Sequence, residues 1–409
     1  MHKYLFVFVV FSLFSPIAIA KDKVQSAIDK VDLLIAQGNI KKASRGNDKL
    51  LQNLKNGSST LAKQRYGLCL IRKGQINAFQ FGDKIKFEKF ICDGEKFVKN
   101  SSPENSPFYI RALLESGKAY FGAHFYFNAS LKLKEIQEII DDKVPVKLQY
   151  EINILHLKVL QKIGNYNEGI QFSKELLKTN KEESHLYQSF RFKVINLQIL
   201  LYISRGEYKL ANQIIEESYE LMRDFEGKKS FLYADINHLM GRSKLIENNA
   251  EASIRYWEDA YVIVDKKNFP CFYSEYTTTG GDISEEFTFL LDNMSQHKYA
   301  GDVVKDYIKH TKKMTGGAVF YRQKKVYYLL KKQLSLGQYE QVLTSIKQLK
   351  NKEPELFSSV YFKKQIEELS LDCNYNLLKF STVENNILQL ITINKLLYGE
   401  QSLHIYSLK

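Results

Sequence analysis

The chain has 409 residues, of which 44% are hydrophobic and 26% are charged, a balance typical of folded proteins and unlike that of disordered ones. Six prolines and 21 glycines are few for an all-β protein, whose many turns need them, so the composition favours long helices. The net charge of +13 predicts affinity for anionic partners or surfaces. Alternatively, part of it reflects an AT-rich genome, which also enriches lysine, isoleucine, asparagine, tyrosine and phenylalanine.

Residues 1–20 have the pattern of a secretory signal peptide. A basic start precedes an apolar run that a Ser-Pro pair ends, and Ala18 and Ala20 are the small residues before a cleavage site. The alternative, an uncleaved membrane anchor, needs about 20 apolar residues, and this run is shorter. We therefore expect export to the bacterial periplasm or the medium, with no integral membrane segment in the mature chain 21–409. An exported protein rarely meets nucleic acid, so we expect no nucleic-acid partner.

One short pattern recurs along the rest of the chain: a glycine, an aromatic or apolar residue two positions later, and in most copies a small residue five positions later. Successive copies begin 36, 50, 40, 42, 41, 50 and 40 residues apart. A period near 40 is typical of helical repeat proteins. Three copies lack the glycine and are weaker matches. The copies begin, in chain order, at Gly38, Gly74, His124, Gly164, Gly206, Glu247, His297 and Gly337.

Each copy of the pattern fits a turn between two helices. Apolar residues at helical spacing stand on both sides, for example in residues 195–203 before Gly206 and in residues 211–221 after it. Glycine supplies the positive φ that a helix C-terminus needs, and the small residue lets the second helix approach the first. Pro354 prevents the second helix of the Gly337 copy from continuing. Since a single hairpin cannot bury its own apolar face, the hairpins are predicted to stack into a solenoid.

This arrangement resembles the tetratricopeptide repeat, most fully in residues 116–136 and 335–354. Gly117 and Tyr120 match the family's first-helix positions, and Ala129 matches a second-helix position. The period exceeds the family's usual length of about 34 residues and is similar to that of kinesin-light-chain-like arrays. The resemblance covers almost all of the chain after the leader. It implies an all-α, right-handed superhelix of about eight or nine antiparallel hairpins and says nothing of the ligand.

The two intervals of 50 residues need extra residues somewhere. We predict loop insertions near 99–107, which is polar and contains proline, and near 266–284. The second insertion carries the aromatic residues Phe272, Tyr273 and Tyr276. These rings either cap a widened gap between repeats or touch a ligand as part of a binding loop.

The chemistry-bearing residue types do not form a recognisable motif. Of the four cysteines, only Cys69 and Cys92 are close enough in sequence to bridge neighbouring helices, and the alternative is a pair of free thiols. The histidines are scattered and no Cys-x2-Cys is present, so we expect no metal site. The sequence also lacks a P-loop lysine and a Gly-x-Ser-x-Gly nucleophile elbow, so we expect no cofactor and no catalytic activity.

The resemblance also implies where a ligand would bind. In tetratricopeptide solenoids the first helix of each hairpin lines a concave face, and family members that hold an acidic peptide end place lysine and asparagine there. A lysine on this face would bind a carboxylate through a charge-assisted hydrogen bond. The alternative is a solvated helix face in a lysine-rich protein. The predicted positions are Arg111, Lys118, Lys158, Lys193, Asn196, Asn237, Lys244, Lys324, Tyr327 and Lys331.

These features favour a periplasmic or secreted scaffold that binds a protein or peptide in a basic concave groove. The positive charge of such a groove would favour an acidic ligand. A second hypothesis is a sensory module that acts with a separate signalling or protease output partner. It is supported by Leu403, Ile405 and Leu408, which begin an apolar helix with no further helix to cover it. A third is a cell-envelope enzyme that acts on glycan or peptide. The sequence leaves the oligomeric state open.

Overall fold

A computed structural model of the chain describes residues 22–36, 39–81, 84–178, 184–267, 280–294, 300–303, 305 and 319–399, which contain helices and no strand. The helices form hairpins, in which we call the first helix A and the second B. In chain order the A and B helices are α2 (Lys23–Ala36) and α3 (Ile40–Leu54), α4 (Thr60–Phe81) and α5 (Lys84–Lys99), α6 (Pro107–Gly122) and α7 (Tyr126–Ile139), α8 (Val146–Ile163) and α9 (Tyr166–Lys178), α10 (His185–Arg205) and α11 (Tyr208–Glu226), α12 (Phe231–Ile246) and α13 (Ala250–Lys267), the A helix α14 (Gly280–Asn293), α16 (Val319–Ser335) and α17 (Tyr339–Lys352), and α18 (Val360–Asn376) and α19 (Phe380–Tyr398). Helical residues 300–303 pack against α14. The predicted all-α solenoid is confirmed.

Three of the predicted turns have the backbone conformation that glycine was expected to supply. Gly164, Gly206 and Gly337 have φ values of +88°, +82° and +71°. The tyrosine two positions after each glycine is the first residue of the B helix. Pro354 follows the end of α17 and begins the short 3-10 helix η1 (Pro354–Ser358), so the second helix stops where proline requires it to stop.

Two of the copies without glycine also form left-handed turns. His124 has a φ of +66°, and in the copy at Glu247 the next residue, Asn248, has a φ of +59°. The pattern search does not identify a further turn at Leu378, which has a φ of +58° and lies one period after Gly337. The pattern misses this turn because leucine stands at the position where the pattern expects glycine, the residue that adopts a positive φ without strain. The copies at Gly38 and His297 lie outside the described residues.

The turn predicted at Gly74 is wrong, because Gly74 lies inside the long helix α4. A Cβ atom at Gly74 would come within 3.0 Å of Ile91 on α5. The same two helices also cross at Gly67 and Gly94, where a Cβ on Gly94 would lie 2.6 Å from the carbonyl oxygen of Gly67. The glycines of α4 therefore serve backbone-to-backbone packing within the α4–α5 hairpin, not the turn.

The A and B helices differ in how much of their surface they bury. Helix α10 buries twelve residues, whereas α11, its B helix, buries four along one stripe. This difference arises because A helices contact one another in series, from α4 to α6, α8, α10 and α12, as well as their own B helices. Five A helices follow a serine whose side chain accepts a hydrogen bond from the backbone N–H three residues on: Ser59, Ser106, Ser184, Ser230 and Ser359.

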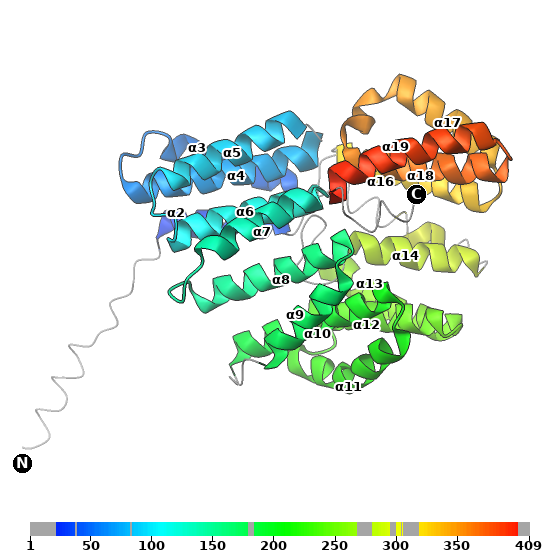
Figure 1. Ribbon diagram of the computed structural model, residues 1–409, viewed down its shortest axis with the longest axis horizontal. Coiled ribbons are helices and arrows are strands. Elements are labelled where there is room, and N and C mark those ends of the chain that lie inside the picture. The colour runs from blue at the N-terminus through cyan, green and yellow to red at the C-terminus, as the bar shows by residue number, and fades with distance from the viewer. Residues whose placement is uncertain are drawn as a thin grey trace, which may run out of the picture.

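The array bends round until its last hairpin lies beside its early ones, as the red α19 and the cyan α7 show in Figure 1. Helix α16 also contacts α4. The rings of His124 and Tyr361 stack with centroids 3.7 Å apart, and those of Tyr126 and Tyr398 stack at 5.4 Å. Leu397 and Tyr398 belong to the same buried cluster as the cores of α6 and α7. We call the contact made by His124, Tyr126, Tyr361 and Tyr398 the clasp.

Candidate functional site

Two of the predicted binding residues, Arg111 and Lys118, meet two carboxylates where α6 faces α8. Arg111 donates to Glu151 through both terminal nitrogens, at 2.6 and 3.2 Å. Lys118 Nζ lies 2.7 Å from Glu151 Oε2 and 3.1 Å from Glu115 Oε1. The two positive and two negative charges sum to zero. The expected basic patch is therefore neutralised by groups of the chain itself.

The polar contacts continue towards the N-terminus along the A helices. Arg72 of α4 donates to Asp32 of α2 at 2.6 Å, and the Gln75 side chain donates to the backbone carbonyl of Glu115 at 3.1 Å. These contacts, like that of Arg111 with Glu151, join residues 40 positions apart, which is the repeat period. The contacts therefore run from one A helix to the next. We call Asp32, Arg72, Arg111, Glu115, Lys118 and Glu151 the charged row.

Glu115 stands at the centre of the charged row. Burial alone would raise the pKa of its carboxyl group, but the positive charges of Lys118, Arg111 and Arg72 lower that pKa from 4.5 to about 2. The carboxylate is therefore ionised across the whole physiological range. It orients the surrounding cations and contributes stability to the array.

Farther along, the charged contacts give way to aromatic ones. The Tyr150 ring on α8 stacks on Phe190 of α10 with centroids 4.1 Å apart and planes within 5° of parallel. The predicted residue Lys158 is buried, with its Nζ 5.6 Å from the centre of the Phe121 ring. The predicted residue Lys193 is half-buried on α10.

The two predicted asparagines lie inside the protein. Asn196 donates to Asp235 of α12 at 2.9 Å, and the Asn237 side chain accepts from the Tyr219 hydroxyl at 3.0 Å. Both asparagines are fully buried, so they hold helices together and do not present an open binding surface. The predicted residue Lys244 forms an ion pair with Glu247 in the same helix end, at 2.9 Å.

Sequence analysis missed a polar contact between α12 and α14. His238 Nε2 lies 3.1 Å from Glu286 Oε2, and Arg242 Nε donates to the same oxygen at 2.8 Å. Burial would raise the pKa of Glu286, but Arg242 and His238 together hold it well below its usual value. The separations of 44 and 48 residues exceed the period of 40. A search for oppositely charged residues between 40 and 50 positions apart would have included this contact.

The remaining predicted positions, Lys324, Tyr327 and Lys331, are half-buried on α16. Lys331 Nζ lies 5.7 Å from the centre of the Tyr327 ring. The structure thus brings Arg111 together with Lys118 and Tyr327 together with Lys331. It does not gather the ten predicted residues into one basic patch.

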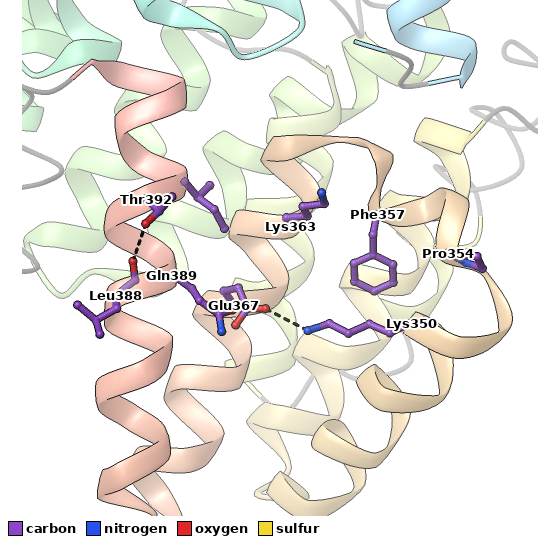
Figure 2. Close-up of a pocket in the computed structure, with 9 residues that line it drawn as sticks. Lys350, Pro354, Phe357, Lys363, Glu367, Leu388, Gln389 and Thr392 are labelled. Carbon is purple, nitrogen blue, oxygen red and sulfur yellow. Dashed lines mark hydrogen bonds and ion pairs between the residues drawn. The ribbon is translucent and has the colours of Figure 1, made fainter. Parts of the chain in front are cut away.

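A pocket of about 550 Å³ opens between α17, η1, α18 and α19 (Figure 2). None of the residues that line this pocket was predicted from the sequence to bind a ligand, because they come from four elements that no shared motif connects. Figure 2 shows the Lys350 side chain reaching Glu367, and the distance from Nζ to Oε1 is 3.1 Å. The lining residues are Lys350, Pro354, Phe357, Lys363, Glu367, Leu388, Gln389, Thr392 and Ile393.

Of the two alternatives for Cys69 and Cys92, the structure has free thiols and not a bridge: Cys69 is buried in α4 and Cys92 is exposed on α5. The described part of the chain contains no group of three or more His, Cys, Asp or Glu side chains that could hold a metal ion. None of its helices is both long and apolar enough to cross a membrane. The predicted signal peptide 1–20, the apolar residues near the C-terminus and the aromatic residues Phe272, Tyr273 and Tyr276 lie outside the described residues.

No protein-family model matches the chain, and no curated protein matches it by sequence. Among solved structures, a Rap protein in complex with competence and sporulation factor is similar, with a TM-score of 0.56 and 13% identity over 92% of this chain and 99% of that one. The apo form of RapI has a TM-score of 0.47 and 12% identity over 93% of this chain and 99% of that one. Aspartyl phosphate phosphatase F from Bacillus subtilis has a TM-score of 0.45 and 11% identity over 95% of this chain and 96% of that one. The first comparison shows that this chain has a Rap-like fold of helical repeats along nearly its whole length.

Proposed function

We propose that this chain is an exported scaffold that binds a protein or peptide segment across its A helices. The charged row is the observation that carries the proposal. Its cations and carboxylates are ion-paired to one another, so they are held in place before a ligand arrives. Asp32 and Arg111 remain partly exposed, with 43% and 31% of their side chains accessible. A preorganised polar strip of this kind lowers the entropic cost of binding.

The spacing of the A helices suits an extended peptide. Packed helices lie about 8–10 Å apart, and an extended chain advances about 3.3 Å per residue. A peptide laid across the row would therefore present about every third residue to a new helix. Because Arg111 and Lys118 already face two carboxylates, the row favours a ligand of mixed charge over a wholly acidic one. The Rap structure with a bound factor supports ligand binding by an array of this fold.

A charge swap tests the proposal without changing the net charge. The variant Arg111→Glu/Glu151→Arg keeps four charges that sum to zero but reverses the polarity at the middle of the row. The matched control Lys209→Glu/Glu216→Lys makes the same exchange on the exposed face of α11. We expect crosslinked pull-down from the native envelope fraction, followed by mass spectrometry, to recover a partner with the wild type and the control. The swapped row should recover much less of it.

Thermal unfolding of each variant checks that the swap has not unfolded the array. Capture that is equal for the wild type and the swapped row would reject the charged row as the binding surface. Reversal of Lys193 and Lys324 to glutamate extends the same assay to the predicted lysines of α10 and α16, and we expect weaker capture without loss of fold.

Export is the second part of the proposal and has its own test. Cell fractionation should place the protein in the periplasm or medium, and N-terminal sequencing of that protein should begin at Lys21. A protein that retains residues 1–20 in the cytoplasmic fraction would contradict export and leave the binding proposal standing.

A further inference from the structure

The pocket between α17, η1, α18 and α19 has the composition of a ligand site. Its volume of about 550 Å³ lies within the range of roughly 300–1,000 Å³ that is usual for small-molecule pockets. Its walls are mostly apolar and include Phe357, Leu388 and Ile393. Leu388 is 58% exposed, so an apolar side chain stands at the rim with no cover from the described part of the chain. An apolar ligand body would gain burial against these three residues.

The one carboxylate in the pocket is already satisfied. Glu367 has only 10% of its side chain accessible. It accepts from Lys350 at 3.1 Å and from Asn386 at 2.9 Å. With its amide turned to donate, Gln389 also reaches Glu367 at 3.2 Å. A cationic ligand would therefore have to displace Lys350 and would gain no new charge partner.

The spare charge of the pocket is positive. Its lining contains Lys350 and Lys363 against the single carboxylate of Glu367, which leaves one net positive charge. Lys363 is exposed, and no acidic side chain among the described residues pairs with it. Lys350 has 49% of its side chain accessible and can donate to a second acceptor while it holds Glu367. Both lysines are therefore available to an anion.

We propose that this pocket binds a ligand with an apolar body that ends in a carboxylate. The body packs against Phe357, Leu388 and Ile393, and the carboxylate accepts hydrogen bonds from Lys363 and Lys350. A medium-chain fatty acid and the C-terminal residue of a peptide share this chemistry. The proposal does not depend on the charged row, since no residue belongs to both sites.

Matched probes isolate the role of the carboxylate. Isothermal titration calorimetry of the full mature chain would compare decanoate with decanol, and acetyl-Leu-Phe with its C-terminal amide. We expect at least one acid to bind, about tenfold more tightly than its neutral counterpart, because a charge-assisted bond replaces a neutral one. Decanoate and the dipeptide distinguish a free acid from a peptide end. The absence of binding by both acids at millimolar concentration would overturn the proposal, as would equal binding of acid and neutral probe.

Three variants locate the probe. Lys363→Glu should weaken the acid about tenfold or more, because it replaces attraction by repulsion at the rim. Lys347→Glu makes the same change on the exposed face of α17 outside the pocket and should leave the affinity unchanged. Leu388→Asp alters an exposed wall residue and should abolish binding without unfolding the protein. Binding that survives both Lys363→Glu and Leu388→Asp would place the acid elsewhere and overturn the proposal. The Arg111→Glu/Glu151→Arg swap should bind the acid normally, which separates this site from the charged row.

Discussion

Removal of one ring from the clasp should loosen a segment more than 200 positions away in the sequence. In an open solenoid each hairpin contacts only its neighbours, so a change in α18 would affect α16, α17, η1 and α19 but not α6 or α7. Here Tyr361 of α18 stacks on His124 in the α6–α7 turn. The substitution Tyr361→Ala should therefore destabilise both the C-terminal hairpin and the α6–α7 turn.

The size of the effect follows from the geometry of the clasp. The stacked pair has a centroid distance of 3.7 Å and an angle of 14° between planes, and aromatic pairs are worth about 0.5–1.5 kcal/mol beyond their burial. Loss of about 1 kcal/mol raises the population of the opened clasp about fivefold at 25 °C. The second stack, between Tyr126 and Tyr398, remains in place, so we expect loosening and not complete release.

Hydrogen exchange of backbone amides measures this opening directly. Amides of the α6–α7 turn should exchange about fivefold faster in Tyr361→Ala than in the wild type. The control Tyr375→Ala changes the same residue type on the same helix at a position that is 63% exposed, and it should leave that turn unchanged. Faster exchange that is confined to α18 and α19 would refute the idea that the clasp couples the two ends.

Three further predictions concern single residues. Because Glu115 has a folded pKa of about 2 against 4.5 unfolded, its contribution of at most about 3 kcal/mol is complete above pH 4.5 and falls away towards pH 2. Urea unfolding of Glu115→Gln should therefore show a flatter loss of stability between pH 4.5 and 3 than the wild type, and an identical slope would contradict the assignment. Gly241→Ala should cost about 2–3 kcal/mol and shift the fluorescence of the one tryptophan, because the new Cβ would lie 2.1 Å from the Trp257 ring. Gly206→Ala meets no atom within 4 Å but keeps a φ of +82°, so a smaller cost of about 1 kcal/mol is expected; a larger loss of thermal stability at Gly206 than at Gly241 would reverse this order.

The turns were predictable because each depends on a few consecutive residues. A positive φ at Gly164, Gly206 and Gly337 is a local backbone requirement that glycine meets at low cost, and the sequence displays it directly. His124 shows that the same conformation also occurs without glycine. Gly74 shows the converse, since a glycine in the right local context serves helix packing instead.

The candidate sites were less predictable because they depend on which residues face one another across hairpins. The repeat positions that placed Arg111 and Lys118 on an A helix carry no information about Glu151. This glutamate lies on the next A helix and forms ion pairs with both residues. The pocket between α17, η1, α18 and α19 was even less predictable from the sequence. Lys363 and Leu388 belong to different helices, and the 3-10 helix η1 between α17 and α18 adds further lining residues to the same space.

The clasp also sets how many hairpins this chain can have. Helical arrays commonly gain or lose whole units in evolution, since each added unit only lengthens an open spiral. Here Tyr361 and Tyr398 must arrive beside His124 and Tyr126 after a fixed number of steps round the spiral. One duplicated or deleted unit would carry the two tyrosines past or short of their partners. Relatives that keep these rings should therefore keep the same number of units, while relatives without them are free to vary in length.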